Sequence, residues 1–486
     1  MKPFLTGENP VAKSLPFIFA AVFFTGLGCL GFPRPMMDDL FFTGAGLNLA
    51  AGGDFSNPLL ARQDFPGTLY FLHPPLHSYA IAGWLKIFGV STASLLAFQA
   101  VMYVLICWST ICILRKHRAP HLLEWLLPLG VASAFLSVGL RSEPLAAALT
   151  MLGFALVECL GQKTVLLFCG FLLLFLGASV ASRLSFFSAA LALASFVRLF
   201  LGGTSFIRLG VLAGTALIVA MLGFSCLIGF HFQEFYKIYH FHAAGRLGGD
   251  IGSLLGHFFR GILGISQWPL LLLWLVSLPL LYRLSSKTRD LVRASLFVSG
   301  VFLLLMLTGI GGEGAIWYVV FSLFALTAAY AQQSSPGRSR LAQMSLAAAL
   351  LIGNGRSGVE LFGLATGHIT TETNLQTIPA PASGRPVLIN PESARYAFDY
   401  RLPKGAIDWN FSAPFPAELA TETVLHPDDV YIVGPTVLEV LDREKWLDES
   451  VPRWNPLGRA RWSFLQHPHW TYVINGKDCL PPKPQN

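Results

Sequence analysis

Long apolar stretches alternate with short polar turns over most of the chain. They lie near 15–32, 93–114, 121–139, 145–161, 164–182, 184–201, 207–230, 269–284, 293–311, 315–332 and 341–354. Most approach the roughly 20 apolar residues that a helix needs to cross the hydrocarbon of a bilayer. The pattern predicts an α-helical polytopic membrane protein with about eleven transmembrane helices.

The pattern changes after about residue 358, where charged residues and prolines become more frequent. The segments "RPVLIN" and "PESARYAFDYRL" have strand and then helix character, and "DVYIVG" followed by "PTVLEVLDREKWL" repeats that order. Two strand–helix alternations are typical of a small α/β unit. We therefore divide the chain into a membrane domain at 1–355 and a C-terminal α/β domain at 356–486.

The composition agrees with a membrane protein. Of the 486 residues, 53% are hydrophobic and 13% are charged, whereas about a quarter of the residues of a soluble domain are charged. The net charge of +7 is modest, and basic residues in membrane proteins mainly report topology. We expect membrane lipids as partners and no nucleic acid.

The basic turns predict the orientation. The segments "RKHR" and "RLSSKTR" fall on the same side as the N-terminus, which places that side in the cytoplasm. The first apolar stretch has no cleavage site after it and is interpreted as a retained helix. We therefore predict a multi-pass protein of the inner (plasma) membrane whose C-terminal domain lies outside the cytoplasm. Two long outer loops are expected, at 33–92 and 231–268, the first containing a short interfacial helix in "LHSYAIAGWLKIFG".

An acidic pair stands at the outer end of the first predicted span. Asp38 and Asp39 precede the segment "LFFTGAGLNLA". One of them can cap the first turn of a helix, which leaves the other without a role. A carboxylate at this boundary can also act as a general base that takes the proton of an attacking hydroxyl.

Four more ionisable residues are predicted on the same face. His73 precedes two prolines and has a plain reading as part of a turn. Arg141 and Glu143 at the start of an outer helix can form a surface ion pair, and Arg183 between two spans can extend to the interface. Each residue can be explained separately without a function. Taken together, however, they place ionisable groups and positive charge on one side of the membrane.

The order of these motifs resembles a known class. A first helix is followed by the acidic pair, then "HPPL", then "LRSEPLA" and then "SRLS". This order is similar to that of the GT-C class of polytopic glycosyltransferases, in particular bacterial relatives of dolichyl-phosphate-mannose–protein mannosyltransferases and of lipid A aminoarabinose transferases. The resemblance covers about residues 15–200.

The resemblance implies an enzyme and roles for its residues. Members transfer a sugar from a polyprenyl-phosphate donor to a hydroxyl on the outer side, and the acceptor is an envelope glycan, a lipid or a protein. The family base maps to Asp38, with Asp39 as the alternate because many relatives carry Asp-Glu here. Substrate binding maps to His73, Arg141, Glu143, Arg183 and, more weakly, Arg246 or Arg260.

No cofactor is expected, because the donor carries its own leaving group and the sequence has no Gly-rich phosphate loop. A metal is not expected either, since the adjacent acids have no evident third ligand. The alternative function is a transporter or flippase, which predicts ionisable residues in the middle of spans. Most acids are expected at the outer boundary instead, and Glu158, near an inner helix end, is the main exception. A non-catalytic assembly protein is a further alternative, although it leaves the outer acids without a role.

Overall fold

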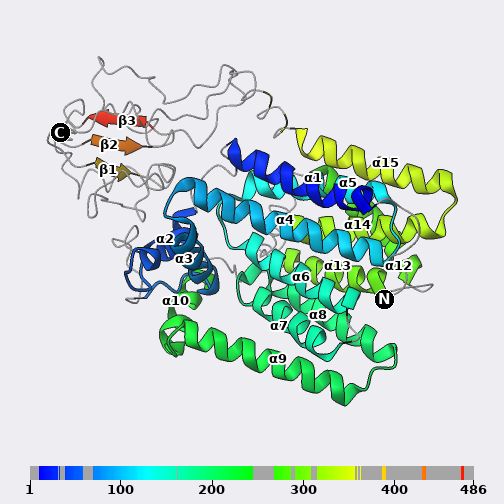
Figure 1. Cartoon of the computed structure of the whole chain (residues 1–486), viewed down its shortest axis with the longest axis horizontal. Helices are drawn as coiled ribbons and strands as arrows, with labels where there is room; N and C mark the ends of the chain where they lie inside the picture. The colour runs from blue at the N-terminus through cyan, green and yellow to red at the C-terminus, as the bar shows by residue number, and fades with distance from the viewer. Residues whose placement is uncertain are drawn as a thin grey trace, which may run out of the picture.

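The computed structural model describes residues 10–30, 32, 39–57, 69–160, 163–244, 268–285, 290–307, 315–355, 358 and 362, together with three short strands. Within these ranges the chain forms a bundle of long helices, with shorter helices gathered at one end (Figure 1).

Every predicted apolar stretch forms a helix. In chain order these are α1 (Pro10–Cys29), α4 (Thr92–Lys116), α5 (His121–Val138), α6 (Glu143–Leu160), α7 (Thr164–Ala178), α8 (Ser182–Leu201), α9 (Phe206–Leu227), α12 (Trp268–Ser285), α13 (Asp290–Leu307), α14 (Ala315–Gln333) and α15 (Pro336–Gly353). α15 begins five residues before the predicted stretch, because Pro336 is suited to a first helical position and lets the helix start in polar sequence.

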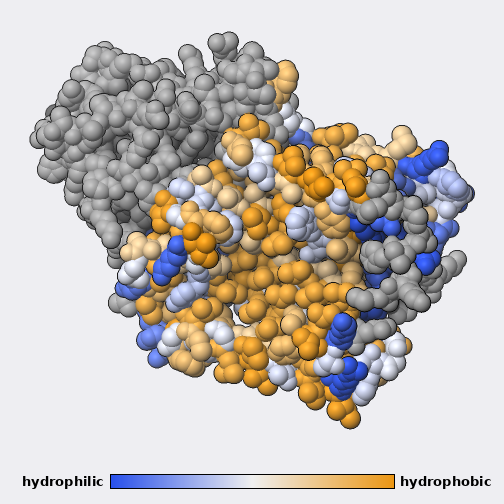
Figure 2. Space-filling model, in the orientation of Figure 1, coloured by the Kyte–Doolittle hydropathy of each residue, from blue (hydrophilic) through white to orange (hydrophobic). Residues whose placement is uncertain are grey.

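The helices present an apolar exterior. Among the described residues, five helical segments are long and apolar enough to cross a membrane: Val11–Cys29, Ala93–Lys116, Glu143–Leu160, Ser182–Leu201 and Phe206–Leu227. Figure 2 shows a broad apolar face across the bundle. Among the exposed apolar residues of the chain are Ile207, Val211 and Met221 of α9. The chain thus has the surface of an integral membrane protein. That all eleven helices cross remains a prediction.

The long helices run back and forth, so their connections alternate between two ends. We call one the cap end, because α2 (Asp39–Ala50), α3 (Leu76–Phe88) and α10 (Phe232–Ala244) lie there, at the left of Figure 1. The opposite end is called the far end. α3 confirms the short helix predicted in the first outer loop. α10 was not predicted, because its segment was expected only as part of the outer loop at 231–268.

Two contacts link α10 to the segment between α2 and α3. The backbone N–H of Leu69 donates to Glu234 Oε1 at 3.1 Å. The rings of Phe71 and Phe235 meet edge to face with centroids 5.7 Å apart. The two segments expected as separate outer loops therefore pack together as one cap.

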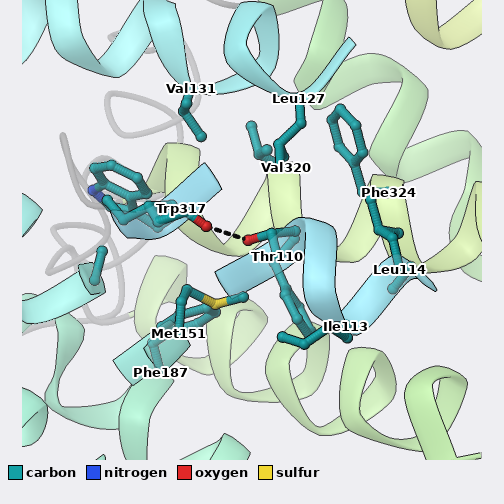
Figure 3. A pocket seen from close by; sticks show the side chains of 14 residues that line it. Thr110, Ile113, Leu114, Leu127, Val131, Met151, Phe187, Trp317, Val320 and Phe324 are labelled. Atoms are coloured by element: carbon teal, nitrogen blue, oxygen red, sulfur yellow. Dashed lines mark hydrogen bonds between the residues drawn. The ribbon is translucent and has the colours of Figure 1, made fainter. Parts of the chain in front are cut away.

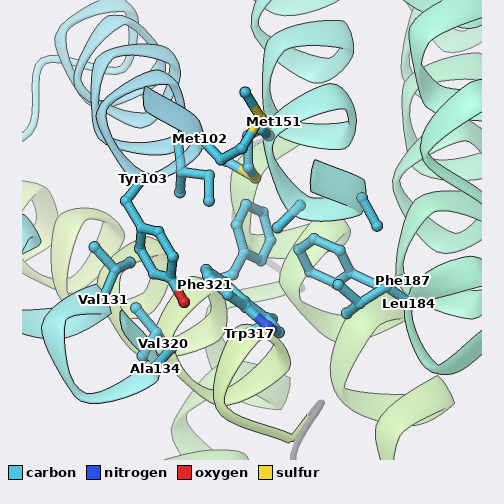
Figure 4. Close-up of a cluster of buried hydrophobic side chains, with 14 of the residues drawn as sticks. Met102, Tyr103, Val131, Ala134, Met151, Leu184, Phe187, Trp317, Val320 and Phe321 are labelled. Atoms are coloured by element: carbon cyan, nitrogen blue, oxygen red, sulfur yellow. The ribbon is translucent and has the colours of Figure 1, made fainter. Parts of the chain in front are cut away.

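Aromatic side chains and small residues pack the bundle. Tyr103 packs against the rings of Phe24 and Phe135. It also packs against Trp317, beside which it is drawn in Figure 4. Glycines allow α6 and α7 to approach closely: a Cβ at Gly153 would lie 2.7 Å from the carbonyl oxygen of Gly170. Close contact through small residues is typical of helix packing in membranes.

Buried ion pairs hold the far end. Glu124, 1% exposed, accepts hydrogen bonds from Arg115 Nε at 3.0 Å and Nη2 at 2.6 Å. Glu158, also buried, lies 2.8 Å from Arg198 Nε and 3.3 Å from His117 Nε2. These pairs tie α4, α5, α6 and α8 together. Glu158, the main argument for transport, thus lies in an ion pair at a helix end.

Three strands are described in the C-terminal region. β1 (Pro386–Ile389) pairs in parallel with β2 (Val430–Val433), and β2 pairs antiparallel with β3 (Tyr472–Asn475). β1 and β2 fall at the two predicted strands. The helices expected after them lie outside the described residues, so the α/β domain and the division at residue 355 remain predictions.

Candidate functional site

A buried ion pair marks the cap end of α6. α5 ends at Gly139, whose φ of +67° suits glycine and lets the chain reverse direction. Glu143 begins α6, and the Arg141 guanidinium reaches back to it with both Nη2–Oε1 at 3.2 Å and Nε–Oε2 at 3.3 Å. The side chains are 6% and 3% exposed. The alternative of a surface ion pair is therefore wrong.

Arg183 joins this pair from a neighbouring helix. It lies in the first turn of α8, where it is half-buried. Its charge interacts with Glu143, as that of Arg141 does. The hydroxyl of Tyr318 in α14 donates to the Arg183 carbonyl at 2.8 Å and fixes the start of α8. The structure thus brings Arg141, Glu143 and Arg183 together, with two positive charges around one carboxylate.

Phe42 connects α2 to the pair. The Arg141 guanidinium carbon lies 4.7 Å from the centre of the Phe42 ring. The same ring stacks on His73, with centroids 4.0 Å apart and planes 20° apart. A cation over an aromatic face is attracted by the ring quadrupole. His73 therefore belongs to the arrangement through Phe42, a residue that was not predicted.

The acidic pair is only partly described. α2 begins at Asp39, which agrees with a helix starting at these acids. The Asp39 side chain, Asp38 and Arg246 lie outside the described residues. Asp39 precedes Phe42 by three positions in α2, a spacing that puts two positions on one helix face. Phe42, which contacts Arg141, thus lies one turn after the start of α2.

Uncharged polar groups surround the ion pair, and none was predicted. Gln99 of α4, 1% exposed, donates from Nε2 to the Arg141 carbonyl at 3.1 Å. His77 of α3, 2% exposed, lies beside the Leu140 backbone. Burial lowers the pKa of His77 to about 4, against the opposing pull of the nearby Glu143 charge. At neutral pH its ring is therefore uncharged.

An apolar cavity of about 30 Å³ lies deeper in the bundle. Trp317, Phe187 and Met151 line it together with Thr110, whose hydroxyl donates to the Ile106 carbonyl at 2.7 Å (Figure 3). It has room for about one water. Its lining is mostly apolar, although the indole nitrogen of Trp317, one of the lining residues, has no hydrogen-bond partner among the described residues. Within the described part of the chain, no charged side chain lines the cavity.

Comparison with known proteins supports the fold. No protein-family model and no curated protein matches the sequence. The structure is similar to the crystal structure of ArnT from Cupriavidus metallidurans bound to undecaprenyl phosphate, with a TM-score of 0.54 and 13% identity over 90% of this chain and 95% of that one. The chain has an ArnT-like, GT-C-like fold. The resemblance drawn from the motifs is thus confirmed for the fold of a polytopic membrane protein.

Proposed function

We propose that this protein is a membrane glycosyltransferase that moves a sugar from a polyprenyl-phosphate donor to a hydroxyl acceptor. The observation that carries the proposal is the buried pair of Arg141 and Glu143, joined by Arg183, at the cap end. Two arginines near one carboxylate leave a local excess of positive charge, which suits an anionic group of a ligand. The similar ArnT structure contains undecaprenyl phosphate, an anion that such arginines can bind.

The arginines have a defined role in this mechanism. As the bond between the anomeric carbon and the phosphate oxygen breaks, its electron pair goes to the phosphate. Arg141 and Arg183 stabilise the charge that grows there. Glu143 holds Arg141 in a fixed orientation through its two contacts. The positive charge comes from the chain itself, and the reaction needs no metal.

The acid pair supplies the base. Asp38 takes the proton from the acceptor hydroxyl as its oxygen attacks the anomeric carbon, with Asp39 as the alternate. The products are the glycosylated acceptor and the polyprenyl phosphate. Attack from the face opposite the phosphate, in one step, inverts the anomeric configuration. The reaction takes place on the extracytoplasmic side of the inner membrane.

The arrangement of buried acids speaks against transport. Among the described residues, the buried carboxylates are Glu124, Glu143 and Glu158, and each lies within the first or last turn of its helix. Transporters place ionisable residues near the middle of the membrane. The acids here are at the ends of the bundle.

Sugar release from undecaprenyl-phosphate sugars tests the proposal. The purified full chain, with an envelope extract as acceptor, is compared with Asp38→Asn and Asp39→Asn. We expect Asp38→Asn to lower transfer by at least about 100-fold while donor binding is retained. Asp54→Asn is the matched control, since Asp54 closes a local turn with Asn48 and Ser56.

The outcomes separate the function from the assignment of the base. A wild-type protein that consumes none of the donors contradicts the glycosyltransferase. Loss in Asp39→Asn alone keeps the function and moves the base to Asp39. Equal loss in Asp54→Asn shows that the assay reports damage to the cap rather than chemistry.

A further inference from the structure

Several buried polar atoms near the Arg141–Glu143 pair have no hydrogen-bond partner among the described residues. They are Oε1 of Gln99, the hydroxyl of Tyr103, the indole nitrogen of Trp317 and the ring nitrogens of His77, apart from an interaction of the His77 ring with the Leu140 backbone. An unsatisfied buried polar atom destabilises a protein by about 1–3 kcal/mol, and more than about 90% of buried polar groups are paired. A group of them in one neighbourhood therefore points to a ligand.

Contacts place these atoms around one segment of the chain. His77 lies beside Leu140 and near the charge of Glu143. Gln99 is bonded through its other amide atom to Arg141. Tyr103 lies one turn further along α4 than Gln99, on the same face of the helix, and its ring packs against that of Trp317. The 140–143 segment is thus the common neighbour of α3 and α4 at the site.

The chemistry of these atoms selects the ligand. A neutral histidine offers one donor and one acceptor, an amide oxygen only accepts, and a phenol does both. A phosphate takes donors only, so the Gln99 oxygen would disfavour it. A hydroxyl group donates once and accepts twice, which fits all three side chains. A sugar ring carries several such groups.

We propose that His77, Gln99 and Tyr103 form a neutral subsite that hydrogen-bonds the hydroxyl groups of the transferred sugar. The inference rests on the proposed function. It assigns the phosphate and the sugar of the donor to two different sets of side chains. The arginines hold the phosphate and the neutral groups recognise the sugar. Trp317, whose ring centre lies 5.6 Å from that of Tyr103, borders this subsite.

Tyr103→Phe isolates the subsite, because it removes one oxygen that has no partner in the described residues. A purely structural hydroxyl would lower stability when lost. This one is expected to leave the melting temperature unchanged or slightly higher, since an unsatisfied buried group disappears. His77→Phe has the same logic. Tyr330→Phe, at the far end of α14, is the matched control.

The experiment measures dissociation constants of the full chain in nanodiscs for undecaprenyl phosphate and for the same carrier bearing glucose, mannose or 4-amino-4-deoxyarabinose. We expect wild type to bind one sugar-bearing carrier more tightly than the bare one. Tyr103→Phe and His77→Phe should weaken that binding about five- to tenfold and leave binding of bare undecaprenyl phosphate unchanged. Tyr330→Phe should change neither.

Each contrary result has its own meaning. Equal loss for bare and sugar-bearing carriers, or no loss at all, overturns the subsite and assigns these atoms to water or to folding. Wild-type binding that is no tighter with any sugar than without one also overturns it. Failure of wild type to bind any of the four lipids contradicts the proposed function itself.

Discussion

Both ends of the helix bundle bury a glutamate beside an arginine, but their surroundings differ. At the far end, Glu124 receives two hydrogen bonds from Arg115 at 2.6 and 3.0 Å. Arg115 also donates to the Lys13 carbonyl at 2.7 Å. At the cap end the contacts between Arg141 and Glu143 are 3.2 and 3.3 Å. Buried neutral groups without partners surround that looser pair.

The difference separates a structural ion pair from a binding site. The short bonds from Arg115 to Glu124 and to the Lys13 carbonyl stabilise one arrangement of helices. Longer contacts beside unsatisfied donors and acceptors leave interactions to be made when a substrate arrives. The presence of Arg and Glu is therefore a weaker indication of function than the hydrogen bonds left open around them.

The largest expected effect concerns stability at the far end. Arg115→Ala leaves Glu124 buried without its main partner, and we expect a loss of about 3–5 kcal/mol in unfolding free energy. Transfer activity per folded molecule should stay near that of wild type. Thermal unfolding in detergent measures the first and the donor assay the second. The double variant Arg115→Leu/Glu124→Leu should recover much of the stability. If Arg115→Ala lost activity without losing stability, the far end would contain the functional site rather than a structural ion pair.

At the cap end the same kind of change should affect activity instead. Arg141→Lys keeps the charge but loses the planar guanidinium that contacts Glu143 twice and lies over Phe42. We expect sugar transfer to fall about 100-fold with a small change in melting temperature. Arg198→Lys at the far end is the matched control and should retain activity. Similar activity in both variants would mean that neither arginine binds the donor.

A pH titration tests the neutral state of His77. The pKa of His77 is lowered from 6.5 to about 4 by burial, so the unfolded chain binds the proton more readily than the folded one. Stability that is present above pH 6.5 is then lost as the pH falls toward 4. Between pH 7 and 5, wild type should lose about 2 kcal/mol more than His77→Phe. Parallel stability curves for the two proteins would contradict a buried neutral imidazole.

The smallest effect is expected at Phe42. Phe42→Leu removes the ring under Arg141 and should reduce transfer about fivefold, in line with about 1 kcal/mol for a cation–π contact. Phe42→Tyr keeps the ring and should retain most of the activity. Phe171→Leu in α7 removes a buried ring away from the site and reports the loss from packing alone. An equal decrease in Phe42→Leu and Phe171→Leu would remove Phe42 from the site.

The helices were predictable because membrane burial imposes a length and an apolar composition on each one. The group of Arg141, Glu143 and Arg183 was predictable for a related reason. Charged residues at the ends of membrane helices on the same side of the bilayer lie at the same depth, and so can meet. Asp38, Arg246 and the side chain of Asp39 lie outside the described residues, so their predicted roles remain untested.

The other members of the site could not be read from the chain. Phe42, Gln99 and Tyr103 sit in apolar segments where aromatic and amide side chains normally pack without function. His77 lies in a helix that was expected only to lie in the membrane interface. They were identified because segments far apart in sequence pack together there, and because some of their polar atoms have no hydrogen-bond partner among the described residues. Neither leaves a local pattern.

The hydrogen bond from Leu69 to Glu234 has a consequence for biogenesis. Its partners are 165 residues apart, and helices α3 to α9, which lie between them in the chain, must be synthesised first. At about 5–20 residues per second, the ribosome needs on the order of 10–30 s to make that segment. During this interval the segment around Leu69 lacks its contact with Glu234. Nascent chains stopped before α10 would present an open cap to chaperones and proteases.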